Sequence, residues 1–162
     1  MNTKKAINKT MLVLDNIRSS ENVGSLFRTA DAFGISEIIL IGITPTPIDR
    51  FGRPNSKVAK TALGAEKTIP WQHVATPEEA TKYIQDKKIP LYVLEQNKKA
   101  VPLAKQKEKD FALVLGNEVN GVSDYFLQHT DTIFEILMHG EKESLNVSVA
   151  GGIALYALVA RG

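Results

Sequence analysis

Short apolar runs alternate with helical patterns along this chain, and that alternation is compatible with few folds. Five runs have the length of a strand, at residues 11–14, 37–41, 91–94, 111–115 and 132–136. The first, second and fourth are almost continuously apolar, which is typical of strands in a parallel sheet covered on both faces. The sequence therefore predicts an α/β fold built on a parallel sheet.

Helix candidates lie between and after these strands, near residues 22–33, 55–61, 77–87, 123–129 and 145–160. In the first candidate, the apolar residues fall within an arc of about 120° when each residue turns the helix by about 100°. Arg28 points about 160° away from the centre of that arc. We expect Arg28 on the exposed side of the helix, away from the sheet.

The chain has 162 residues, the length of one domain, and we expect a single domain over residues 1–162. It contains no cysteine, which excludes disulfides, cysteine-ligated zinc, iron–sulfur clusters and thiol nucleophiles and suits the cytoplasm. The uncharged stretch near the C-terminus, residues 144–160, is shorter than the roughly 20 apolar residues of a membrane-spanning helix. We therefore expect a cytoplasmic protein without membrane contact.

Several common motifs of cofactor and catalytic sites are absent from the sequence. The glycines form neither the G-x-G-x-x-G of dinucleotide sites nor the phosphate-binding G-x-x-x-x-G-K. The three histidines, His73, His129 and His139, lie far apart without metal-ligand spacing, and no serine stands in a G-x-S-x-G turn. These absences argue against NAD-binding, P-loop, zinc and serine-hydrolase sites.

Three segments instead contain asparagine and serine, at 22–29, 115–123 and 144–150, and the first two add glycine and a charged residue. Each lies at the carboxyl end of a predicted strand or at the start of a predicted helix. Ligands of open α/β sheets bind at that edge, where helix N-termini offer free N–H groups. Any one segment is also explained as a turn, but the three together indicate a binding site.

The three segments resemble the motifs of the SpoU-type (TrmH-like) RNA 2′-O-ribose methyltransferases of the SPOUT superfamily. The motif N-x-G-x-x-x-R-T stands at residues 22–29, and L-G-N-E-x-x-G-[IV]-S stands at 115–123. The third motif, I-P-M-x-G followed by S-L-N-V-S-V-A, stands at 136–140 and 144–150, with Leu137 in place of the usual proline. The resemblance extends from Leu12 to Tyr156.

The resemblance implies a parallel α/β sheet with a deep trefoil knot in its C-terminal part, and a homodimer whose active site uses both subunits. It also implies S-adenosyl-L-methionine as the cofactor and S-adenosyl-L-homocysteine as the product, without a metal. The residues expected to bind the cofactor lie in loops at the strand ends: Leu94, Glu95, Leu115, Gly116, Asn117, Gly121, Ile136, Met138, Ser144, Leu145 and Asn146.

For catalysis, the resemblance implies Arg28 beside the ribose 2′-hydroxyl, together with Asn22, Glu118, Ser144 and Asn146. A guanidinium group has a pKa above about 12 and is therefore a poor base. We expect Arg28 to clamp a substrate phosphate through two parallel hydrogen bonds. That phosphate or a neighbouring group would then accept the proton of the 2′-hydroxyl.

The net charge of +2 is small for a nucleic-acid-binding protein, so the basic residues that meet RNA must be concentrated locally. Arg50, Arg53, Lys57 and Lys60, in and after the loop 42–56, are the expected RNA contacts together with Arg28. A second basic stretch, residues 98–109, is either a solvated linker or part of this surface. No separate RNA-binding domain is expected. Transfer RNA is our first choice of substrate, and ribosomal RNA is the alternative.

Two rival functions stay open at this stage: a knotted module that binds RNA or cofactor without turnover, and a generic nucleotide-binding protein of flavodoxin or NAD type. The last helix also has two explanations. It is apolar on all sides, so it is either buried within one domain or covered by a second subunit. Gly151 and Gly152 each cost about 1 kcal/mol in a helix, and close packing would offset that cost.

Overall fold

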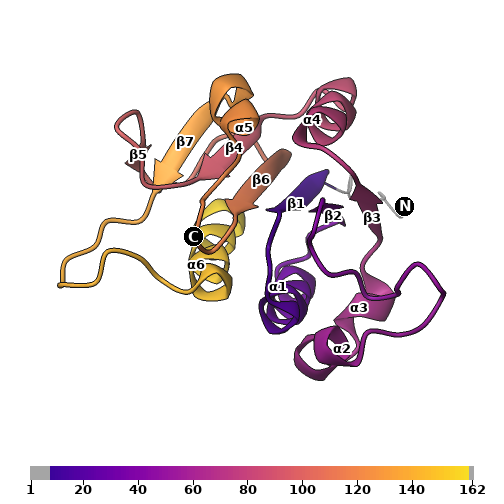
Figure 1. Ribbon diagram of the computed structural model, residues 1–162. Helices are drawn as coiled ribbons and strands as arrows, with labels where there is room; N and C mark the ends of the chain where they lie inside the picture. Colours follow the sequence, from indigo (N-terminus) through magenta and orange to yellow (C-terminus); the bar gives the residue numbers. More distant parts are fainter. Residues whose placement is uncertain (1–7, 161–162) are drawn as a thin grey trace, which may run out of the picture.

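Across residues 8–160, the part that the computed structural model describes, a seven-stranded sheet forms the centre of the molecule (Figure 1). The strands are β1 (Thr10–Asp15), β2 (Glu37–Ile41), β3 (Trp71–Val74), β4 (Leu91–Leu94), β5 (Val101–Pro102), β6 (Phe111–Gly116) and β7 (Thr132–Glu135). Their order across the sheet is β3-β2-β1-β6-β4-β7-β5, and every neighbouring pair is parallel. All carboxyl ends of the strands therefore lie along one edge, as expected for the predicted fold class.

Helices cover both faces of the sheet (Figure 1). They are α1 (Ser20–Ala32), α2 (Ser56–Ala62), α3 (Ala65–Thr68), α4 (Pro77–Asp86), α5 (Asp124–His129) and α6 (Val147–Val159). Leu12 and Leu14 of β1 belong to the core under α1, α2, α3 and α6. Met11 and Val13 belong to the core under α4 and α5. Successive residues of β1 thus face opposite cores, which explains why the central strands are apolar at consecutive positions.

All predicted strands and helices are present, and their ends differ from the predicted ones by at most two residues. The structure adds β3, β5 and α3. The sequence of β3 is Trp-Gln-His-Val, and it becomes a strand through its pairing with β2 at the edge of the sheet. β5 has two residues, one of them a proline, which only an edge position accommodates. These two strands depend on their neighbours rather than on a pattern of their own.

Helix α6 is apolar on all sides, but residues 8–160 cover it on one side only. Gly151 and Leu155 face the sheet, and a Cβ at position 151 would collide with the side chain of Leu115. Close packing therefore does offset the cost of this glycine, as expected. On the other side Val149, Ile153 and Tyr156 are 51%, 42% and 63% exposed. Burial within residues 8–160 thus leaves part of the apolar surface of α6 exposed.

No helix within residues 8–160 is long and apolar enough to cross a bilayer. The order and direction of the strands agree with the parallel sheet that the resemblance implies. The threading of α6 through a loop, which would make the trefoil knot, stays a prediction.

Candidate functional site

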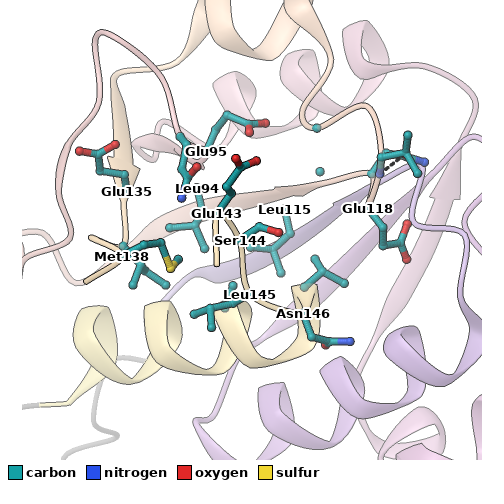
Figure 2. A pocket seen from close by; sticks show the side chains of 18 residues that line it. Leu94, Glu95, Leu115, Glu118, Glu135, Met138, Glu143, Ser144, Leu145 and Asn146 are labelled. Carbon is teal, nitrogen blue, oxygen red and sulfur yellow. Dashed lines mark hydrogen bonds between the residues drawn. The ribbon is translucent and has the colours of Figure 1, made fainter. Parts of the chain in front are cut away.

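A cavity of about 560 Å³ opens at the carboxyl edge of the sheet, beside the ends of β4, β6 and β7 and the start of α6 (Figure 2). Its volume lies in the range of pockets that hold small molecules. All the residues predicted as cofactor contacts line it: Leu94, Glu95, Leu115, Gly116, Asn117, Gly121, Ile136, Met138, Ser144, Leu145 and Asn146. Segments far apart in the sequence meet here because β4 lies between β6 and β7 in the sheet.

The lining of this cavity is acidic and apolar. Its carboxylates are those of Glu95, Glu118, Glu135 and Glu143, and within residues 8–160 no lysine, arginine or histidine lines it. Figure 2 shows Glu135 and Glu118 at opposite ends of the cavity. Attraction between opposite charges strengthens as water is excluded, so this lining favours a ligand that combines positive charge with an apolar part. It disfavours the phosphates of a dinucleotide or a flavin nucleotide.

The loop after β6 is shaped by two of its motif residues, Asn117 and Gly121. Asn117 Oδ1 accepts the N–H of Val119 at 2.9 Å, and Asn117 Nδ2 donates to the Asn16 carbonyl at 2.7 Å. Gly121 has a φ of +72°, and a Cβ at this position would collide with the Glu95 carboxylate. The asparagine and the glycine are therefore needed to keep this wall of the cavity in place.

Two carboxylates hold the end of the same loop. Glu95 Oε2 accepts the N–H of Val122 at 2.7 Å. Asp15, at the end of β1, accepts the N–H and the hydroxyl of Ser123 at 2.6 and 3.0 Å. Asp15 is 1% exposed, so its carboxylate depends on these donors in place of water. The Glu95 carboxylate, which the sequence predicted as a cofactor contact, thus already serves to position the loop.

Replacing Asp15 with asparagine is expected to lower the free energy of unfolding by about 1–3 kcal/mol, because an amide nitrogen would then face the donors of Ser123. Urea denaturation measures the change. The control is Asp86→Asn at the exposed end of α4, which is expected to change the stability by less than about 0.5 kcal/mol. Equal stability of the Asp15 variant and the wild type would contradict this role.

Glu118 joins the three motifs through hydrogen bonds. Its carboxylate accepts the backbone N–H groups of Arg18 and Ser19 at 3.0 and 3.3 Å, where the chain enters α1. It also accepts Nδ2 of Asn22 at 3.3 Å. Asn146, which caps α6, donates its Nδ2 to Oδ1 of Asn22 at 3.3 Å. A continuous chain of hydrogen bonds therefore connects the first, second and third motifs.

The surroundings of Glu118 keep its carboxyl ionised. Burial raises the pKa of this group, but the N–H groups of Arg18, Glu118 and Ser19 and the amide of Asn22 outweigh burial, so the pKa lies below its usual value. A carboxyl with a lowered pKa is a poor general acid and a poor general base at neutral pH. Glu118 therefore acts as a hydrogen-bond acceptor that positions its donors.

Arg28 is exposed, as its place on the helix predicted, but it does not line the cavity. It lies six residues after Asn22 on α1, about 9 Å further along the helix axis. There it lines a separate surface hollow of about 680 Å³, together with Lys60 of α2 and Gly152 of α6. Within one chain the structure brings the other four predicted catalytic residues together and leaves Arg28 apart.

The expected RNA contacts lie on the loop before α2 and on α2 itself. Arg50, Arg53, Lys57 and Lys60 are all exposed. Arg53 Nε pairs with Asp49 Oδ2 at 3.0 Å, the one ion pair present in the described part of the chain. The other three side chains therefore have no carboxylate partner between residues 8 and 160. The same stretch contains no group of three His, Cys, Asp or Glu side chains placed to hold a metal ion.

Sequence reasoning missed three acidic residues of the site: Asp15, Glu135 and Glu143. Asp15 and Glu135 end β1 and β7. A charged residue at or next to the carboxyl end of a predicted strand was the available signal for both. Glu143 follows no such run, because it lies in the loop between β7 and α6, and its place in the cavity depends on the path of that loop.

Comparison with protein families gives one match that covers most of the chain. The model of the SpoU rRNA methylase family matches residues 9–156. The 23S rRNA (guanosine-2′-O-)-methyltransferase RlmB of Xylella fastidiosa (strain 9a5c) is 34% identical over 149 residues, which are 92% of this chain and 57% of that protein. This chain therefore spans somewhat more than half the length of the relative.

Solved structures give the same picture of the fold. The AdoMet-bound rRNA methyltransferase from Sinorhizobium meliloti superposes with a TM-score of 0.80 and 26% identity, over 92% of this chain and 55% of that one. The TrmH/SpoU tRNA modifying enzyme of A. aeolicus superposes with a TM-score of 0.78 and 25% identity, over 93% and 73%.

Proposed function

Because the chain belongs to the SpoU rRNA methylase family, we propose that it is an S-adenosyl-L-methionine-dependent methyltransferase that acts on the ribose 2′-oxygen of ribosomal RNA. The observation that carries this proposal is the acidic cavity at the strand ends, to which all three motifs are connected through Glu118, Asn22 and Asn146. A protein of flavodoxin or NAD type would place donors or cations around the phosphates of its ligand. The four carboxylates of this cavity would instead repel the phosphates of FMN or NAD.

Ribosomal RNA replaces transfer RNA as the first choice of substrate. The relative that is 34% identical is named for its action on 23S rRNA, whereas the tRNA-modifying neighbour is 25% identical. Transfer RNA is the second candidate on the strength of that neighbour. A ribosomal substrate would place the enzyme in the cytoplasm.

The cavity suits S-adenosyl-L-methionine, which when bound supplies a methyl group on a positively charged sulfur. The lining carboxylates offset positive charge, and Leu94, Met138 and Leu145 offer apolar surface to the remainder of such a ligand. No cationic side chain between residues 8 and 160 would repel it from the lining. The residues present therefore fit this cofactor.

The amides at the edge of the cavity have defined orientations. The N–H of Ser148 donates to Asn146, Nδ2 of Asn146 donates to Asn22, and Nδ2 of Asn22 donates to Glu118. This series of hydrogen bonds ends on the carboxylate of Glu118, which only accepts, so each amide nitrogen is fixed as the donor. Each nitrogen also keeps a second N–H, and we assign these to oxygens of the substrate ribose or phosphate. Ser144, which lines the cavity beside them, offers a hydroxyl to the same region.

Arg28 would complete the site from a second subunit in a homodimer. The exposed apolar side of α6, formed by Val149, Ile153 and Tyr156, needs a cover. The hollow that contains Arg28 is lined by Gly152 of the same helix, so a subunit packed on α6 also meets Arg28. In this arrangement Arg28 binds a phosphate of the RNA whose ribose lies at the partner's cavity.

Calorimetry followed by methyl transfer tests the proposed function. We expect S-adenosyl-L-methionine to bind with one site per chain, and we expect no binding of NAD or FMN. Labelled methyl should then pass to unmodified 23S rRNA in preference to unmodified tRNA, and mapping should locate it on a ribose 2′-oxygen. Binding of the cofactor without transfer to either RNA would favour the non-catalytic module, and binding of NAD or FMN alone would contradict the proposal.

A further inference from the structure

Phe51 is an exposed aromatic residue between two arginines, and nothing in the proposed reaction uses it. It is 66% exposed. The Cζ atoms of Arg50 and Arg53 lie 4.8 and 5.0 Å from the centroid of its ring. An arginine over an aromatic face is attracted by the ring electrons, so this group combines a flat apolar surface with two positive charges.

The loop that carries Phe51 is closed and braced by hydrogen bonds. Ile48 and Pro54 form an antiparallel bridge that closes residues 49–53 into a turn. The Asp49 carboxylate accepts the N–H of Phe51 at 2.8 Å, and the N–H and Nε of Arg53 at 2.9 and 3.0 Å. Chiefly through the N–H of Arg53, these contacts lower the pKa of the Asp49 carboxyl, so the brace is charged at neutral pH.

The two arginines differ in whether a carboxylate holds the side chain. Arg53 is paired with Asp49, whereas Arg50 has no carboxylate partner in the part of the chain that the structure describes. A ligand phosphate can therefore draw Arg50 away from the ring without breaking an ion pair. Arg50 also borders a surface hollow of about 510 Å³, which Trp71 and His73 line from β3. Arg50 thus connects the ring of Phe51 to this hollow.

We propose that Phe51 is a stacking platform for an unpaired base of the substrate RNA, with Arg50 and Arg53 contacting the adjacent phosphates. The proposal rests on the proposed RNA methyltransferase function and deepens it. Bases in a duplex are stacked on their neighbours and offer no free face, whereas a base in a loop or bulge stacks on aromatic rings and guanidinium planes. The substrate nucleotides near this loop are therefore single-stranded.

The charges of this surface favour nucleic acid over a protein partner. Lys57 and Lys60 continue the positive charge of Arg50 and Arg53 along α2, and all four side chains are exposed. The buried centre of a protein–protein interface is poor in charged residues, and lysine is depleted from it. An RNA backbone instead supplies one negative charge for each nucleotide, which matches a row of cations.

Fluorescence anisotropy with a labelled oligouridylate, and with a paired RNA duplex of the same length, tests the platform in the full-length protein. Phe51→Ala is expected to weaken binding of the single strand by about 5- to 100-fold and to leave duplex binding within about twofold. Phe51→Tyr, which keeps the ring, should bind like the wild type. Arg50→Ala should reduce the slope of log affinity against log salt concentration by about 1.

Two further variants separate stacking from general apolar contact. Phe51→Leu keeps the apolar bulk without an aromatic face, so it should bind the single strand as weakly as Phe51→Ala. Ile43→Ala is the matched control, because Ile43 is 65% exposed at the start of the same loop and should not matter. Normal affinity in Phe51→Leu or Phe51→Ala would overturn the proposal, and so would an equal loss of duplex binding.

Two other results would also overturn the platform while testing the methyltransferase proposal separately. Dissociation of the protein's subunits by Phe51→Ala, seen in sedimentation, would assign the ring to a protein interface. If the wild-type protein transfers methyl to RNA but does not bind the single strand, the stacking proposal is wrong and the methyltransferase proposal stands. If the wild-type protein transfers no methyl to RNA, the methyltransferase proposal itself is wrong.

Discussion

Replacing Arg28 with lysine is expected to slow methyl transfer by about 100-fold or more, while the affinity for S-adenosyl-L-methionine stays within about twofold. Lysine keeps the positive charge but cannot form the two parallel hydrogen bonds by which a guanidinium clamps a phosphate. Cofactor binding should be preserved because Arg28 does not line the cavity. Single-turnover transfer with excess enzyme gives the rate of the chemical step, and calorimetry gives the affinity.

The alanine variant and the pH dependence separate a clamp from a base. Arg28→Ala should be about as slow as Arg28→Lys if geometry matters more than charge. If the residue instead removed the proton, Arg28→Lys should recover activity as the pH rises towards the ordinary lysine pKa of about 10.4. The clamp predicts no such recovery. Near-normal transfer by Arg28→Lys at neutral pH would rule the clamp out.

The central strands were predictable because each carries its own signal. Residues 11–14 and 111–115 are apolar at every position, and in the structure these positions point alternately into two cores. The edge strands carry no such signal. Gln72 and His73 of β3 are polar, and β5 contains Pro102. Their strand conformation comes from pairing with β2 and β7, which no local pattern encodes.

The motif residues of the cavity were predictable for a different reason. Asn117 accepts a backbone N–H two residues later, and Gly121 adopts a positive φ, so both residues are required by the local backbone. The motif that contains them therefore identifies the loop. Asp15 satisfies a demand of a distant segment, since Ser123 lies 108 positions away along the chain. The position of Asp15 at the end of an apolar run is a local signal of a polar role, but no local pattern identifies Ser123 as its partner. Glu143 is brought to the cavity by the path of the loop between β7 and α6, which no local pattern predicts.

Two features that one chain leaves unexplained, the position of Arg28 and the exposed apolar side of α6, lie beside each other. Arg28 is the one predicted catalytic residue that, within residues 8–160, neither lines the cavity nor is hydrogen-bonded to a residue that lines it, and its hollow adjoins α6 through Gly152. Helix α6 is also the element with an uncovered apolar side. A second copy of the chain packed on α6 would resolve both, because it would bury the apolar side and bring Arg28 to another cavity. This arrangement makes a specific prediction for mixed dimers.

Mixed dimers of Arg28→Ala and Asn146→Ala chains are expected to regain about half of the wild-type activity, although each variant alone is nearly inactive. In the proposed dimer, twofold symmetry would give each site Arg28 from one subunit and the cavity from the other. One site of the mixed dimer then combines the intact Arg28 with the intact cavity, and the other site lacks both. Co-expression with two affinity tags isolates the mixed dimer, and methyl transfer is measured for each dimer.

The result discriminates between a shared site and a site within one chain. If Arg28 served the cavity of its own subunit, both sites of the mixed dimer would lack one residue, and activity would stay at the level of the parent variants. Asn146 also caps α6, and loss of a cap costs about 1 kcal/mol, so thermal unfolding of the Asn146→Ala dimer is measured alongside. Restored transfer in a folded mixed dimer requires that the two residues act across the subunit boundary.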